Sequence, residues 1–193
     1  FIPEFIHKKR DDHIKSSIIY VTIIIFITNL LVIAGVYLLS SYLSIKFFHS
    51  PQANDLLRLL AIDFFIDSFV FVIRFAFQGF KEMTYFSIVE VVRMFLILGI
   101  VLVGFKLGYG RLPTVAFAYI ITPVILILVF TPIFLKKVFP QFAASRLVLD
   151  LSLFKEIGKY GLFVVETSAA SLVLYYTDIL ALTYFSNLTE VGL

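Results

Sequence analysis

The segment from residue 54 to residue 79 constrains the fold most, because it is long enough to cross a bilayer yet carries Asp63, Asp67 and Arg74. Its fifteen Leu, Ile, Phe and Val residues favour insertion by about 0.3–0.6 kcal/mol each, whereas each central charge opposes insertion by about 2.5–3.5 kcal/mol. A lone helix of this composition is therefore not stable in lipid. The three charged positions fall within about 40° of one another on a helix. The sequence thus predicts a charged stripe that faces other helices or a water-filled cavity.

The rest of the chain is apolar enough to place it among membrane proteins. Of the 193 residues, 61% are hydrophobic and the mean hydropathy is +1.02, whereas soluble domains are about 45–50% apolar. Uncharged runs extend over residues 16–45 and 112–135, and each exceeds the roughly 20 residues that span a bilayer. We therefore expect an all-α, polytopic transmembrane helix bundle.

The breaks in the apolar pattern predict five transmembrane helices and a short interfacial helix. The predicted spans cover about residues 17–47, 54–79, 81–105, 112–138 and 159–185. Residues 1–15 are expected to form a loop or an amphipathic lead-in, and residues 139–158 a linker with the interfacial helix. Pro123 and Pro132 are expected to kink the fourth span.

The basic residues are distributed unequally between the two ends of these spans. Ten of them fall on the side of residues 1–15, whereas Lys46, Lys106 and Arg111 fall on the other side. The positive-inside rule places residues 1–15 in the cytoplasm and residues 186–193 outside, in a multi-pass protein of the cell membrane. Because the basic residues lie mostly beside spans, they do not predict a nucleic-acid partner.

The second and third spans are expected to share a network of charges. If they fold as a hairpin about residue 80, Asp67 lies level with Arg93, and Arg74 comes within reach of Glu90. Glu90 and Arg93 share one face of their helix because they are three residues apart. Such pairing lowers the cost of holding four charges away from bulk water. The network either orients the helices only or lines a transport path.

Two further acidic residues have no partner that the sequence identifies. Asp63 lies four residues from Asp67 and repels it, so Asp63 is expected to be protonated, paired from another helix, or free to bind a substrate or a cation. Asp178 follows Tyr175, Tyr176 and Thr177. It is expected either to border a cavity or to make a hydrogen bond that packs helices.

Two other features suggest local structure. Arg58 lies near a helix end on another face and is expected to reach the lipid headgroups. Gly104 and Gly108 are spaced like a helix-packing pair, but Lys106 lies between them, so we expect a turn here instead of a helix contact.

No enzyme, cofactor or metal site is predicted. The chain has no cysteine, and its three histidines lie outside the spans without ligand spacing. It contains no P-loop, no dinucleotide-binding glycine pattern and no Ser/His/Asp arrangement. The chain begins with Phe1 instead of Met, and we expect it to be part of a longer protein.

Three stretches together resemble a family of membrane transporters. Residues 74–85, RFAFQGFKEMTY, followed by Glu90 and Arg93, are similar to the Gln-Gly turn between the fourth and fifth helices of polysaccharide and lipid-linked oligosaccharide flippases. Residues 154–162, FKEIGKYGL, resemble the entry to the seventh helix of these flippases. Residues 176–180, YTDIL, and 185–193, FSNLTEVGL, resemble the end of that helix and the turn after it.

The resemblance implies the multidrug/oligosaccharidyl-lipid/polysaccharide transporter fold, in which two lobes rock to expose a central cavity to either side. Residues 1–138 would be the last four helices of the first lobe, 139–158 the link between lobes, and 159–193 the first helix and outer turn of the second lobe. The implied partners are a polyprenyl-linked saccharide, membrane lipids and the remaining helices of the same chain.

The resemblance also implies roles for individual residues. Arg74 and Arg93 would contact the phosphate of the lipid-linked saccharide. We add the hypothesis that Asp63 or Asp178 assists coupling to Na⁺ or H⁺. Two alternatives stay open at this point. One is a cation-coupled multidrug exporter of the same superfamily that uses Asp63 and Asp67. The other is a membrane scaffold subunit with no transport path.

Overall fold

The computed structural model describes residues 1–109 and 111–185, and each regular element within these ranges is a helix. The predicted all-α class is therefore confirmed. In chain order the elements are α1 (Ile2–His7), α2 (Asp11–Lys46), α3 (Ala53–Gly79), α4 (Met83–Lys106), α5 (Arg111–Ile133), a π-helix (Phe134–Val138), a 3₁₀ turn (Pro140–Phe142) and α6 (Leu151–Phe185).

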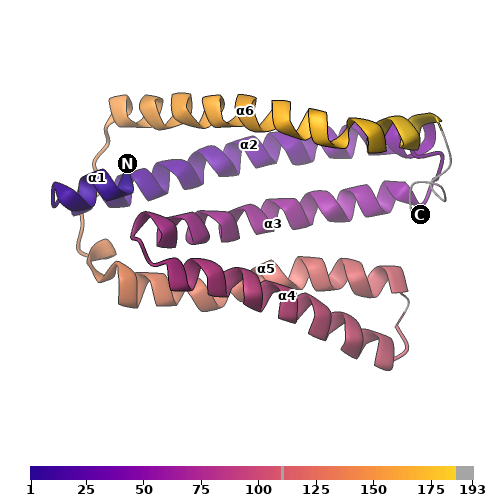
Figure 1. Cartoon of the computed structure of the whole chain (residues 1–193), viewed down its shortest axis with the longest axis horizontal. Helices are drawn as coiled ribbons and strands as arrows, with labels where there is room; N and C mark the ends of the chain where they lie inside the picture. The colour runs from indigo at the N-terminus through magenta and orange to yellow at the C-terminus, as the bar shows by residue number, and fades with distance from the viewer. Residues whose placement is uncertain (110, 186–193) are drawn as a thin grey trace.

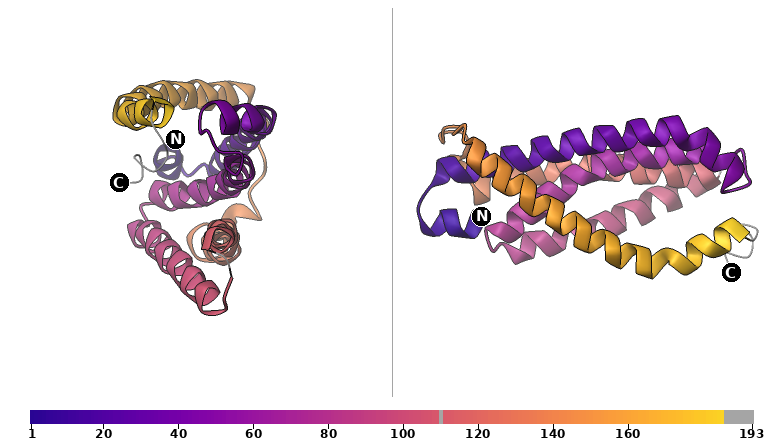
Figure 2. Two further views of the ribbon diagram at one scale, coloured as in Figure 1. Left: turned by 90° about the vertical axis from the view of Figure 1, so that its right-hand side faces the viewer. Right: turned by 90° about the horizontal axis from the view of Figure 1, so that it is seen from above.

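The helix α3 lies in the middle of the bundle. It contacts α2 on one side and both α4 and α5 on the other (Figure 1). The helices α2 to α5 run alternately up and down. The last helix, α6, packs against α2 and crosses the bundle at a slant, as the orange-to-yellow ribbon in Figure 2 shows. The predicted charged segment thus forms the central helix.

Exposed large apolar residues, together with small polar residues among the buried ones, are typical of a membrane protein. The buried polar residues of α2 are small, and one of them, Asn29, donates a hydrogen bond of 2.6 Å to Ser68 Oγ of α3. Small polar residues let transmembrane helices approach closely and bond to one another. Large apolar residues such as Leu38 and Phe95 are exposed instead, as expected for side chains that face lipid.

By length and composition, three segments in the described part of the chain can cross a membrane. They are Asp11–Lys46, Met83–Lys106 and Thr114–Val138. The helix α3 is long enough, but its three central charges lower its apolar character. That α3 and α6 also cross the membrane, giving five spans, stays a prediction.

The ends of several helices differ from the sequence prediction. The first long helix begins at Asp11 and not near residue 17, so it includes part of the charged segment that was expected to precede it. The fourth predicted span ends in a π-helix two residues after Pro132. Because proline lacks a backbone N–H, it interrupts the regular hydrogen-bond ladder, and this favours a wider turn.

No helix boundary separates the predicted interfacial helix from the last predicted span. Instead, α6 begins at Leu151 and continues to Phe185. The carboxylate of Asp150 accepts hydrogen bonds from the backbone N–H groups of Ser152 (2.8 Å) and Leu153 (3.2 Å). This is N-capping geometry, in which a side-chain oxygen satisfies the first free donors of a helix. The cap explains why the helix begins eight residues before the predicted position.

The linker before α6 is held against the start of α2 by side chains of α2. Asp12 Oδ1 accepts from the N–H of Arg146 (2.6 Å), and Ser16 Oγ accepts from the N–H of Val148 (2.9 Å). The Tyr20 hydroxyl donates to Val148 O (2.7 Å) and accepts from the N–H of Asp150 (2.9 Å). These bonds satisfy the backbone of an irregular segment, and they fix where α6 leaves the bundle.

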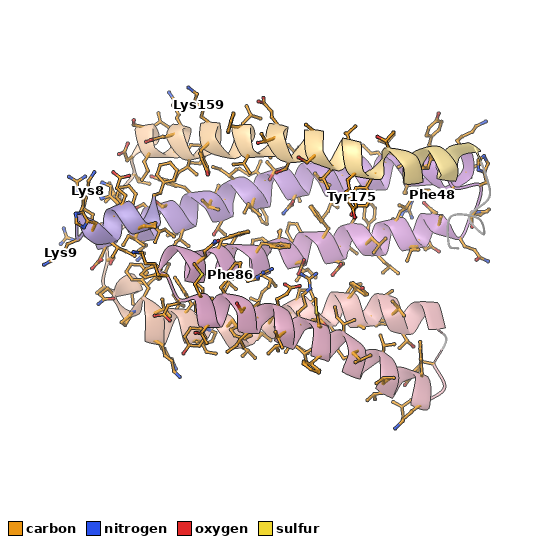
Figure 3. All side chains as sticks on the ribbon, viewed as in Figure 1. Lys8, Lys9, Phe48, Phe86, Lys159 and Tyr175 are labelled. Carbon is orange, nitrogen blue, oxygen red and sulfur yellow. The ribbon has the colours of Figure 1, made fainter. Side chains whose placement is uncertain are left out.

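One end of the bundle gathers the segments that the charge pattern placed on one side. Gly79, at the end of α3, lies against Ile2 of α1, and Phe80 packs on Phe134 and Phe139 near the linker. Lys8, Lys9 and Lys159 lie at this same end (Figure 3). The common side of these segments agrees with the prediction, whereas the side of the membrane that they face stays a prediction.

The opposite end contains a close contact between α4 and α5. A Cβ atom at Gly104 would overlap the Cγ2 methyl of Thr114. Gly104 lies inside α4, as the predicted span 81–105 implied, but the expectation that it makes no helix contact is wrong. The predicted turn is confirmed at Gly108, which has a φ of 80° after the helix.

Candidate functional site

The charged residues of α3 and α4 form two ion pairs across the interface between these helices. Arg74 Nη1 lies 2.7 Å from Glu90 Oε2, and Arg93 Nη2 lies 2.9 Å from Asp67 Oδ2. Both pairs were predicted, because the short connection after Gly79 makes the helices antiparallel neighbours. Each pair joins one residue of α3 to one of α4. The four charges therefore sum to zero within a narrow region.

The two ion pairs differ in their exposure to solvent. Asp67 is buried, with 6% of its surface exposed, and the side chain of its partner Arg93 is 19% exposed. The side chain of Arg74 is 15% exposed, but that of Glu90 is 33% exposed. The Asp67–Arg93 pair is therefore the more shielded one, where charge interactions are stronger and loss of one partner is more costly.

Each pair leaves hydrogen-bonding capacity unused in the described part of the chain. A guanidinium carries five N–H donors, and a carboxylate has two acceptor oxygens. Among the described residues, the buried atoms Asp67 Oδ1 and Arg74 Nε have no hydrogen-bond partner. Buried polar groups are rarely left unpaired. These two atoms are therefore buried polar atoms that the described residues leave unsatisfied.

Aromatic rings line the cationic side of the cluster. The Arg74 guanidinium lies 4.6 Å from the centroid of Phe86 and 5.8 Å from that of Phe71. The Arg93 guanidinium lies 6.0 Å from the same Phe71 ring. These distances are within the range of cation–π attraction. The sequence prediction missed both rings, although Phe71 lies three residues before Arg74 and so shares its helix face.

Asp63 lies apart from both ion pairs. It lines a small cavity of about 100 Å³ between α3 and α5, together with Leu60 and Tyr119. No ion pair or hydrogen bond of its side chain is found among the described residues. Of the three predicted states of Asp63, pairing from another helix is therefore not observed in this part of the chain.

Arg58 and Asp178 are the other charged residues for which the sequence suggested a location. That Arg58 reaches the lipid headgroups stays a prediction, and within the protein its side chain contacts α2. It donates to Ser40 Oγ of α2 (3.1 Å) and lies 5.4 Å from the Tyr37 ring. Asp178 belongs to α6, but its side chain lies outside the described part of the structure.

The described residues contain no group of three or more His, Cys, Asp or Glu side chains that could hold a metal ion.

The site between α3 and α4 combines two guanidinium groups, two carboxylates and aromatic rings. This combination can bind an anion or a polar ligand through hydrogen bonds, and the unpaired Asp63 can accept a cation or a proton.

Comparisons with known proteins agree with this membrane architecture. A family profile described as "polysaccharide biosynthesis protein" matches residues 2–193. The chain is 30% identical to an uncharacterized membrane protein of Methanocaldococcus jannaschii, over 204 aligned positions that cover the whole chain and 40% of that relative. The chain thus spans less than half of this relative's length. No solved structure matches the chain.

Proposed function

Since this chain belongs to the polysaccharide biosynthesis protein family, we propose that the full-length protein carries a lipid-linked saccharide across the membrane by alternating access. Members of this family are membrane proteins related to transporters and not to a class of enzymes. The chain would then contribute helices to both lobes of such a transporter. Helices α2 to α5 would belong to the first lobe and α6 to the second.

The charged cluster between α3 and α4 is the observation that carries this proposal. A saccharide linked to a polyprenyl phosphate has many hydroxyl groups and a negative charge, and both are costly to place in hydrocarbon. A protein that lowers this cost must offer polar groups at the depth of the membrane core. The two ion pairs supply such groups within otherwise apolar helices.

The proposed contact is between the phosphate and the two arginines. Guanidinium groups match phosphate oxygens in geometry and charge. Each ion pair uses one terminal nitrogen, Nη1 of Arg74 and Nη2 of Arg93, so other N–H groups are left for an anion. In this arrangement Glu90 and Asp67 hold the arginines in place and offset their positive charge.

An exchange of charges separates this role from a purely structural one. In cells that lack the gene, the full-length protein with Arg74→Gln or Arg93→Gln should lose surface polysaccharide while it stays in the membrane. The double variant Arg74→Glu/Glu90→Arg retains an ion pair but moves the positive charge to α4. We expect it to restore protein level and not polysaccharide export.

Arg58→Gln is the matched control, because Arg58 lies in the same helix but bonds to Ser40 at the other end. This variant should export polysaccharide normally. Full export by the charge-exchanged variant would contradict phosphate binding by Arg74 and support a scaffold, in which the charges only hold helices together.

Asp63 supports a second candidate function, a cation-coupled multidrug exporter of the same superfamily. Its side chain has no ion-pair partner in the described residues and lines a cavity beside Tyr119. A carboxylate in this position can bind Na⁺ or H⁺ in one conformation and release it in another. Loss of drug resistance with retained polysaccharide in Asp63→Asn cells would favour this candidate.

A further inference from the structure

A second cavity lies on the other side of α3 from α4, at the basic end of the bundle. It has a volume of about 550 Å³, which is within the range of about 300–1,000 Å³ typical of ligand sites. From α2 it is lined by Ile18, Val21 and Ile25, which share one helix face, and from α3 by Val72 and Ala76. The start of α6 closes it with Ile157 and Tyr160.

The lining is suited to a hydrocarbon and not to a polar ligand. Among the described residues that line this cavity, no side chain is charged. Apolar and aromatic side chains predominate, and Ser17 and Gln78 are the polar side chains of the lining. The ligand portion that fits here is therefore an uncharged, predominantly hydrocarbon chain.

One layer of aromatic rings separates this cavity from the arginines. Phe71 lines the cavity, and its ring also lies 5.8 Å from the Arg74 guanidinium and 6.0 Å from that of Arg93. Phe75 lines the cavity too and packs at 6.2 Å on Phe86, whose ring contacts Arg74. The apolar cavity and the two arginines thus lie on either side of the same aromatic rings.

We propose that this cavity holds the first isoprenoid units of the polyprenyl carrier while Arg74 and Arg93 contact its phosphate. This inference rests on the proposed function and adds the place where the lipid part is bound. In a polyprenyl phosphate the phosphate is attached directly to a single chain. That chemistry matches an anion site and an apolar cavity that are one ring apart. In a phospholipid, by contrast, a glycerol unit with two ester groups separates the phosphate from two chains.

Binding of farnesyl phosphate to the purified full-length protein tests this assignment. The probe carries one phosphate on a 15-carbon isoprenoid chain. Ile25→Trp fills the cavity from α2 and should weaken binding at least tenfold in a titration. Ile23→Trp is the matched control, because Ile23 is exposed on the same helix and does not line the cavity. It should change the affinity less than twofold.

A photoreactive residue gives a second measurement that does not require a tryptophan to fit. Benzoylphenylalanine at position 25 should crosslink to farnesyl phosphate, and the same residue at position 23 should not. A crosslink from position 25 to another part of the protein would overturn the assignment, because the chain itself would fill the cavity. Equal competition by phosphatidic acid would overturn it as well.

The outcomes also separate this inference from the proposed function. If wild type binds the probe and both tryptophan variants bind it equally well, the cavity is not the chain site, but export by the protein is untouched. If Ile25→Trp loses binding while Arg74→Gln exports polysaccharide normally, the chain site stands and the phosphate contact fails.

Discussion

At the scale of single residues, burial decides what each ion pair contributes. Asp67 is buried and its partner Arg93 is mostly buried. Glu90 is one-third exposed, so water can replace part of its interaction with Arg74. A charged hydrogen bond contributes about 1.5–3 kcal/mol, and leaving a buried charge unpaired costs about 3–5 kcal/mol. The two carboxylates should therefore differ in their effect on stability.

We predict that Asp67→Asn lowers the free energy of unfolding by about 2–3 kcal/mol and Glu90→Gln by about 1 kcal/mol. The amide keeps the shape and one acceptor in both variants, so the difference reports the lost charge. Thermal unfolding of the full-length protein in detergent measures the order of the two effects. A larger loss of stability in Glu90→Gln than in Asp67→Asn would contradict the burial argument.

The sequence predicted the ion pairs because a tight turn fixes which residues of two helices lie at equal depth. Counting outward from residue 80 was sufficient for Asp67 and Arg93. The surroundings of Asp63 could not be predicted in this way. They depend on Tyr119 of α5, which lies more than 50 residues away and is positioned by packing of whole helices.

At the scale of elements, a close contact between α4 and α5 depends on the missing side chain of Gly104. A Cβ added at Gly104 would meet the methyl group of Thr114. Because threonine is branched at Cβ, its side chain has little freedom to move. We predict that Gly104→Ala destabilises the protein by about 1–3 kcal/mol, as overpacking does in other interiors.

Gly99→Ala is the control for this prediction in the same helix, because nothing lies within 4 Å of a Cβ built at Gly99. It should be neutral or slightly stabilising, since alanine favours a helix more than glycine does. Unfolding midpoints of both variants in detergent provide the comparison. Equal midpoints would show that α4 and α5 do not pack closely at Gly104.

The hydrogen bonds between α2 and the linker lead to a prediction about hydrogen exchange. In Tyr20→Phe the ring is kept, but the N–H of Asp150 and the carbonyl of Val148 lose their bonds to the hydroxyl and keep only the 3.1 Å bond between them. We expect faster amide exchange in residues 146–153, measured by mass spectrometry, and a stability loss of about 1–3 kcal/mol. Tyr42→Phe, at an exposed tyrosine of the same helix, should leave exchange in this segment unchanged. Unchanged exchange in Tyr20→Phe would contradict the role of the hydroxyl.

These bonds also explain which helix boundaries the sequence could not predict. The interior of each long helix follows from apolar composition, and proline and glycine mark most of the breaks between helices. The start of α6, however, is set by Asp150 as a cap and by Tyr20 and Ser16 as partners of the linker. Those partners are about 130 residues away in sequence, beyond the reach of any local pattern.

At the scale of the whole molecule, the charge asymmetry has a structural counterpart. The connection between α3 and α4, the linker and α1 lie at one end, and the connections between α2 and α3 and between α4 and α5 lie at the other (Figure 1). The positive-inside rule then assigns the first end to the cytoplasm.

This orientation predicts the labelling of two single-cysteine variants in intact cells. The chain has no cysteine of its own, so Lys106→Cys and Lys81→Cys introduce unique thiols within it. A membrane-impermeant maleimide should label position 106 from outside and position 81 only after the membrane is opened. The reverse pattern would show that the protein has the opposite orientation.

Helix α6 is buried at its start and exposed further along. Its first turns are buried through Leu153 and Ile157, whereas later residues such as Phe163 and Leu172 are exposed. A helix that is anchored at one end and mostly apolar along its exposed length fits the proposed role as the first helix of a second lobe. The resemblance seen in the sequence suggested this division, but composition and periodicity alone did not.

Movement of the lipid itself is the most direct test of transport through the charged cluster. The full-length protein is reconstituted in vesicles with a polyprenyl-linked saccharide, and a saccharide-specific lectin measures how much reaches the opposite leaflet with time. We expect transfer by wild type and by Arg58→Gln, and at least tenfold slower transfer by Arg74→Gln and Arg93→Gln. Transfer at the wild-type rate in both of these arginine variants, or none in wild type, would refute transport through the charged cluster.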